Sequence, residues 1–161
     1  MTDRIRDYLR ARRDLGRDEG PVMVLDLDVV RDNYTAFARA LPDTRVFYAV
    51  KANPAAEVLR LLAEMGSCFD TASVAEIEMA LAAGATAERV SFGNTIKKER
   101  DVVRALKLGI RLFAVDCQAE VEKIFRAAGE AGVETGDVQV FCSILCDGAG
   151  ADWPLSRKFG C

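Results

Sequence analysis

The amine best placed for covalent chemistry is that of Lys51, which follows a short apolar run at residues 46–50. Such a run is typical of a buried strand in a parallel sheet. Because side chains alternate along a strand, we expect Lys51 to share one face with Phe47 and Ala49, at the strand's carboxyl end. Desolvation there makes a lysine a better nucleophile toward an aldehyde. The alternative is a lysine that simply leaves the sheet for solvent.

Two carboxylates follow the next apolar run. Asp70 ends an expected strand at 67–70, so it should lie at the same edge as Lys51, or else cap the helix that follows. Glu76 stands three residues after Ser73, which is the spacing of a capping box. The spacing alone favours a helix cap for Glu76, and a place near the site is the alternative.

The elements that must position these side chains alternate regularly. Strands are predicted near 46–50, 67–70, 89–92, 112–115 and 138–145, with helices over 54–65, 74–83, 97–107 and 118–131 between them. Each helix ends at or near a glycine, as left-handed C-terminal caps require. The first of these helices should be capped by Asn53, with Pro54 in its first position. We expect Lys97, Lys98 and Lys107 on the surface.

Strands alternating with helices predict βαβ units and a parallel sheet, and right-handed crossovers add each new strand on the same side. The expected fold class is α/β, with about five of the eight units of a TIM-type (β/α) barrel. Its inner face is expected to carry Phe47, Ala49, Phe69, Phe92 and Phe113. An open five-stranded sheet is the alternative. Ahead of the barrel we predict a charged helix over 2–14, a strand over 22–27 and a helix over 28–40.

Composition excludes several function classes. The 161 residues carry a net charge of −3, which gives no reason to expect nucleic acid, and no run reaches the ~20 apolar residues of a membrane span. The chain has no histidine, which removes Ser-His and Cys-His triads and most zinc sites, so no metal is predicted. Its five cysteines show no repeated CxxC spacing and suggest reduced thiols in the cytosol.

Several segments carry a family resemblance. Residues 48–53 (YAVKAN) resemble the cofactor-lysine motif of pyridoxal-phosphate (PLP) decarboxylases with an alanine-racemase-like barrel, fold type III. The segments 69–73 (FDTAS), 91–97 (SFGNTIK), 113–116 (FAVD) and 155–160 (LSRKFG) are similar to the ornithine/lysine decarboxylase branch. The motifs run in the same order over residues 21–161, which identifies the chain as the N-terminal portion of a member of that branch.

The resemblance implies that Lys51 binds the PLP aldehyde covalently, with Asp70 and Glu76 close to the cofactor. It implies a division into 1–27, a helix and one strand of a separate β domain, and 28–161, an incomplete PLP-binding barrel. The implied reaction is decarboxylation of ornithine to putrescine, or of lysine to cadaverine, in polyamine biosynthesis. The implied setting is a cytoplasmic homodimer.

Two departures from the family pattern leave a second function open. Ser143 stands where the family carries an arginine facing the cofactor, and serine supplies neither its charge nor its fork of donors. The histidine that stacks on the cofactor ring has no counterpart. Lys158 matches the family in 155–160 only by resemblance, and a loop lysine is the alternative. The competing function is that of a catalytically inactive decarboxylase-like protein or fragment that acts only by binding other proteins.

Overall fold

The computed structural model describes residues 1–17, 20–146, 148, 150–152 and 160–161. The chain forms two compact units, Met1–Asp43 and Thr44–Cys161. The domain boundary predicted after residue 27, between a separate β domain and the barrel, stays a prediction. The second unit holds the sheet, together with Lys51 and the two carboxylates singled out from the sequence.

The second unit is built on a five-stranded parallel sheet with its strands in chain order. The strands are β1 (Phe47–Ala49), β2 (Cys68–Thr71), β3 (Val90–Phe92), β4 (Leu112–Val115) and β5 (Gln139–Cys142). In the register, Ala49 of β1 stands beside Asp70 of β2, which stands beside Ser91 of β3. The predicted α/β class and parallel sheet are confirmed.

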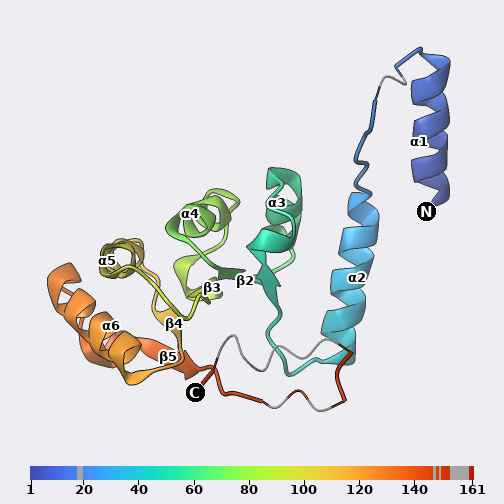
Figure 1. The fold of residues 1–161 in the computed structure, drawn as a ribbon. Coiled ribbons are helices and arrows are strands. Elements are labelled where there is room, and N and C mark those ends of the chain that lie inside the picture. The colour runs from blue at the N-terminus through green and yellow to red at the C-terminus, as the bar shows by residue number, and fades with distance from the viewer. Residues whose placement is uncertain (18–19, 147, 149, 153–159) are drawn as a thin grey trace. The chain divides into compact units, whose positions relative to one another are not determined.

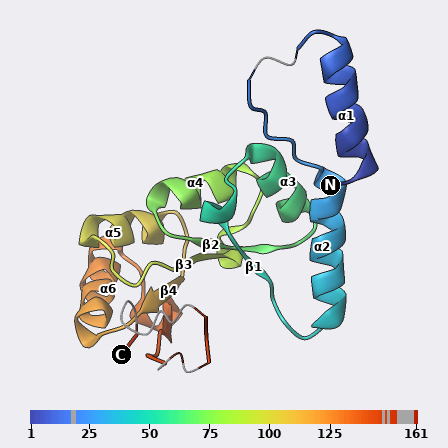
Figure 2. The same cartoon turned by 45° about the vertical axis from the view of Figure 1, so that its right-hand side comes forward.

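Four helices cover one face of this curved sheet (Figure 1), and Figure 2 shows the same arrangement after a 45° turn. They are α3 (Ala56–Glu64), α4 (Val74–Ala82), α5 (Glu99–Lys107) and α6 (Gln118–Ala131). Three short 3-10 turns, η1 (Val50–Ala52), η2 (Ala87–Arg89) and η3 (Thr135–Asp137), lie in the connections. The core fills the space between helices and sheet, where Leu59, Ile77 and Leu106 are buried.

The predicted inner face is wrong in part. Phe69, Phe92 and Phe113 are 0%, 2% and 0% exposed, so they belong to the core beneath the helices. The register explains the error, since Asp70 pairs with Ala49 and Phe69 with Tyr48. Neighbours in register share a face, so Asp70 takes the face of Ala49.

The start of α3 also differs from expectation. The strand ends at Ala49, residues 50–52 form the turn η1, and the helix begins at Ala56, two residues beyond Pro54. Proline disfavours helical backbone in the residue before it, and Asn53 is extended, with φ −159° and ψ 105°. The Asn53 side chain accepts a hydrogen bond from the Ala55 amide at 3.0 Å, so it stabilises the turn before the helix.

The first unit contains α1 (Asp3–Asp14) and α2 (Leu27–Ala40). The strand predicted over 22–27 does not form: residues 21–26 have no sheet partner within the described chain, and Leu27 already begins α2. A strand needs a neighbour for its backbone groups. Asp26 instead caps α2 by accepting a hydrogen bond from the Asp28 amide.

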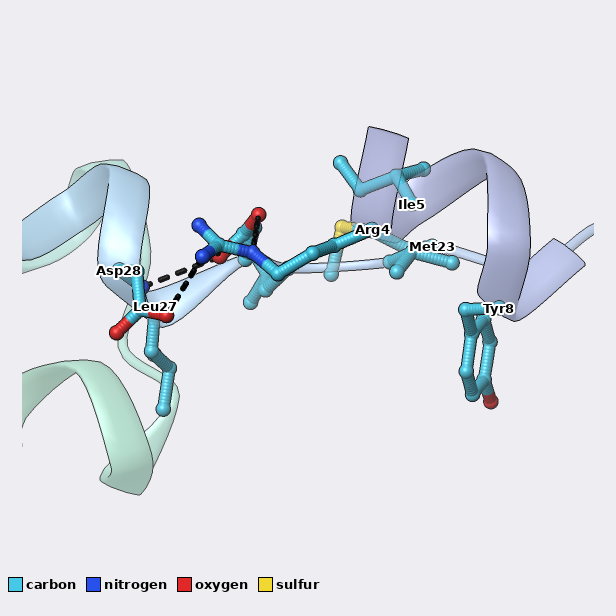
Figure 3. A pocket seen from close by; sticks show the side chains of 9 residues that line it. Arg4, Ile5, Tyr8, Met23, Leu27 and Asp28 are labelled. Carbon is cyan, nitrogen blue, oxygen red and sulfur yellow. Dashed lines mark hydrogen bonds and ion pairs between the residues drawn. The ribbon is translucent and has the colours of Figure 1, made fainter. Parts of the chain in front are cut away.

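A hollow of about 530 Å³ in the first unit is lined by Arg4, Ile5, Tyr8, Met23, Val24, Leu25, Asp26, Leu27 and Asp28 (Figure 3). Its charged groups already form ion pairs with one another. Arg4 lies 3.0 Å from both Asp26 and Asp28, and the Thr2 hydroxyl donates a further hydrogen bond to Asp26. These contacts hold α1 against the start of α2, and they engage the guanidinium and both carboxylates that line this hollow.

Candidate active site at the carboxyl edge of the sheet

The sheet face that the helices leave uncovered carries a hollow of about 530 Å³, lined by Phe47, Ala49, Asp70, Ser91, Gly93, Leu112 and Phe141. All five strands or their ends contribute to it. Its polar groups, Asp70 and Ser91, come from β2 and β3, while Phe47, Leu112 and Phe141 supply apolar walls. An apolar hollow with a few convergent polar groups is the usual form of a small-molecule site.

Asp70 is the central ionisable group of this hollow. Its Oδ1 accepts a hydrogen bond of 2.8 Å from the Ser91 hydroxyl. Burial raises the pKa of Asp70, and it is opposed by the Ser91 hydrogen bond and by the positive charge of Lys51, while Glu76 adds to the rise. Lys51 and Glu76 do not line the hollow themselves, but the charge of each acts on Asp70.

Lys51 lies in η1, two residues beyond the Ala49 that pairs with Asp70. Its side chain is exposed, so the described residues do not provide the desolvation expected from the sequence. The amine is free to approach a carbonyl compound held at the carboxyl edge of the sheet. Its role as the cofactor lysine stays a proposal.

Glu76 caps α4. Its Oε2 accepts a hydrogen bond of 2.7 Å from the Ala72 amide, and its own amide donates to Ser73 Oγ at 3.3 Å. The reach-back goes to Ala72, one residue before the serine that a standard capping box would use. The helix-cap role of Glu76 is therefore observed, while its place near the cofactor stays a prediction.

Gly93 gives the Asp70 carboxylate its place. A Cβ built on Gly93 would overlap Asp70 Oδ1 and lie 2.7 Å from Oδ2. The Gly93 amide donates to the Thr71 carbonyl at 2.8 Å, which holds the backbone of β3's end against β2. Sequence reasoning missed this residue, although a glycine directly after a strand in SFGN can signal close approach.

Lys97 was also missed, and its predicted surface position is wrong. Its side chain is fully buried, and Nζ donates to the carbonyls of Asn94 at 2.9 Å, Thr95 at 3.2 Å and Ala114 at 2.5 Å. It lies 3.4 Å from Glu120 Oε2, and Glu120 also pairs with Lys123. Burial lowers the pKa of Lys97, and Glu120 opposes that shift. Local spacing could not reveal this lysine, because two of its partners lie in β4 and α6.

Of the two positions compared with the family pattern, Ser143 and Lys158, the structure describes only Ser143. Ser143 follows β5 and is half-buried, with its amide donating to the Val115 carbonyl at 2.8 Å. Lys158 lies outside the described residues.

Comparison with known proteins settles the family. Residues 27–161 match the family model described as pyridoxal-dependent decarboxylase, pyridoxal binding domain. The chain belongs to this family. The fit includes the fold: the crystal structure of lysine/ornithine decarboxylase from Vibrio vulnificus, complexed with cadaverine, aligns with a TM-score of 0.79 and 30% identity, over 100% of this chain and 39% of that one.

Two sequence relatives of this decarboxylase domain carry different names. Chloroplastic ornithine decarboxylase of Nicotiana glauca is 41% identical over 124 residues, which is 76% of this chain and 29% of the relative. Antizyme inhibitor 2 of Xenopus laevis is 35% identical over 144 residues, 89% of this chain and 30% of the relative. The chain thus spans about a third of the length of the relatives it matches.

The cofactor of this decarboxylase family is PLP, and the residues present suit it. A PLP site needs an accessible amine for the aldehyde, an acidic group nearby and room for a flat ring. Lys51 offers an exposed amine, Asp70 lies within its electrostatic reach, and the small side chain of Ala49 leaves room in the hollow. Within the described ranges, no helix is both long and apolar enough to cross a membrane.

Proposed function

We propose that this chain supplies the PLP-binding lysine of a decarboxylase that acts on a basic amino acid, converting ornithine to putrescine or lysine to cadaverine. The observation that carries the proposal is the placement of Lys51, just after the carboxyl end of β1, where its charge acts on Asp70 in β2. The relatives named for ornithine and lysine favour these two substrates and a place in polyamine biosynthesis. Because the chain spans about a third of those relatives, the whole protein's activity belongs to the proposal.

Each residue has a distinct task in this proposal. Lys51 binds the cofactor aldehyde, and its exposed amine allows the cofactor to enter. Asp70 places a carboxylate beside that amine, where it stabilises positive charge. Glu76 fixes the start of α4 and strengthens the negative field around Asp70. PLP, when bound, draws electrons from the substrate's α-carbon, which makes loss of CO₂ possible.

Reductive labelling tests the role of Lys51. The chain is incubated with PLP, reduced with borohydride and mapped by peptide mass spectrometry. We expect the pyridoxyl group on Lys51 and its loss in Lys51→Ala, while the matched control Lys107→Ala, which removes an exposed lysine of α5, keeps it. Labelling spread evenly over Lys51, Lys98 and Lys107 would show that Lys51 has no special reactivity.

A second candidate function is protein binding by a catalytically inactive relative. Ser143, in the position that resembles the family's arginine site, favours it, and so does the likeness to a protein named as an inhibitor. The labelling experiment separates the two functions: an inactive relative that has lost its cofactor gives no pyridoxyl-Lys51.

We also propose a cytoplasmic location and a homodimeric whole protein. The five cysteines are all unpaired thiols, which suits a reducing compartment. The homodimer rests on the family resemblance, and sedimentation of the whole protein would test it.

A further inference from the structure

Two thiols meet at the carboxyl end of β5. Cys142 Sγ and Cys161 Sγ lie 3.4 Å apart, although 19 positions separate them in the chain. Both residues are exposed, so small solutes can reach them. Neither has a role in the proposed PLP chemistry.

The backbone, independently of the sulfurs, holds these two segments together. The Cys161 amide donates to the Ser143 carbonyl at 3.1 Å, and the Leu145 amide donates to the Cys161 carbonyl at 3.0 Å. These two bonds bracket Ile144 in the pattern of a parallel strand pair.

Gly160 lets the segments approach this closely. It has φ +104°, and a Cβ there would lie 2.5 Å from both Ile144 C and Leu145 N. A side chain at this position would separate the segments, so the contact between the thiols is built into the sequence by a glycine.

We propose that Cys142 and Cys161 form a reversible intramolecular disulfide, made by exchange with a small-molecule disulfide of the glutathione type. Exchange proceeds by attack of a thiolate on a disulfide sulfur. Cys161 Sγ first bonds to one sulfur of oxidised glutathione, whose S–S bond breaks and releases one glutathione thiolate. Cys142 Sγ then attacks Cys161 Sγ and releases the second. The protein loses two electrons and two protons, and one glutathione disulfide becomes two thiols.

The bond would covalently close residues 142–161 into a loop. Its anchor, Cys142, follows Phe141, which lines the same hollow as Asp70, and precedes Ser143. A disulfide between these two cysteines would therefore form directly beside the wall of the candidate site. The hydrogen bond to Cys161 raises the pKa of the Cys142 thiol, which favours a mildly alkaline buffer for the test.

The test treats the reduced chain with oxidised glutathione, alkylates the remaining thiols and maps the tryptic peptides. Free thiols should fall from the five of the sequence to three. The peptide of residues 127–157 should become disulfide-linked to that of 159–161. Cys142→Ser and Cys161→Ser should each abolish this link.

Because Cys142 and Cys146 share the first peptide, Cys146→Ser is the decisive control, and Cys117→Ser is a second one with an exposed thiol elsewhere. Both should retain the link. The proposal is overturned if Cys146→Ser loses it, if stable glutathione adducts accumulate without a link, if the disulfides formed join separate chains, or if all five thiols remain free.

Discussion

Gly93 and Asp70 pack so closely that the Asp70 carboxylate fills the space where a side chain at position 93 would lie. A Cβ on Gly93 would overlap Asp70 Oδ1 and come within 2.7 Å of Oδ2. The same oxygen, Oδ1, accepts a hydrogen bond from the Ser91 hydroxyl at 2.8 Å, which fixes the carboxylate further. The position of the site's main acid thus depends on a residue with no functional group of its own.

Replacing Gly93 by alanine should therefore destabilise the fold by about 1–3 kcal/mol, the usual cost of overpacking. Urea unfolding measures the change. Gly136→Ala is the matched control, because a Cβ there meets nothing within 4 Å, and it should leave the midpoint nearly unchanged. The cost of Gly93→Ala should shrink in an Asp70→Ala background, and an equal cost in both backgrounds would contradict the contact.

Asp70→Asn should raise stability at neutral pH. Burial raises the pKa of Asp70 above its unfolded value, so the folded chain binds this proton more tightly than the unfolded chain does. The ionised carboxylate then costs stability at neutral pH, and that cost fades as the pH falls through the raised pKa. Urea midpoints of wild type and Asp70→Asn should converge on acidification, with exposed Asp137→Asn as control. A less stable Asp70→Asn at neutral pH would mean that attraction to Lys51 outweighs burial.

Ser143→Arg should strengthen PLP binding about tenfold, the effect of one hydrogen bond to a charged group. The added guanidinium would offer a fork of donors to cofactor oxygens. Absorbance titration with PLP measures the affinity. Gln139→Arg, at the opposite end of the same strand, adds the same charge and should have little effect. Equal gains in both variants would indicate a general effect of positive charge. No gain would mean that position 143 does not correspond to the family's arginine.

The sequence predicted the elements that have a local signal. The five parallel strands and six helices were expected within a few residues, because their apolar periods and glycine ends are local. The errors lie where distant residues decide. Phe69 was assigned to the wrong face because only its partner Tyr48 in β1 fixes the register. Lys97 was placed on the surface because Ala114 and Glu120, which bind it, are remote in sequence. The strand predicted over 22–27 does not form because no other described segment pairs with it, and local sequence does not reveal whether a distant partner exists.

Lys97→Met should cost about 3–5 kcal/mol of folding stability, the range for breaking a buried ion pair from one side. The variant removes three hydrogen bonds to backbone carbonyls and leaves Glu120 with Lys123 alone. Lys98→Met, at an exposed neighbouring position, is the matched control and should change stability by less than about 0.5 kcal/mol. Thermal unfolding of both variants measures the difference, and similar values would refute a structural role for the buried amine.

The edges of the sheet predict self-association of the chain. Within the described residues, β1 pairs only with β2 and β5 only with β4, so one side of each is open. Near β5, Phe125 is 63% exposed and Val140 48% exposed, and they line a common groove of about 140 Å³. Burying about 300 Å² of such surface favours association by about 7 kcal/mol before entropic costs.

Sedimentation should therefore show dimers or larger species for residues 1–161, with negligible release of CO₂ from ornithine. Phe125→Lys and Val140→Lys should each shift the distribution toward monomer, because association would then remove a charged side chain from water. Met79→Lys, which alters an exposed apolar residue of α4, should not. A compact monomer that decarboxylates ornithine would refute the prediction, since it would mean that five strands with open edges form a complete active site.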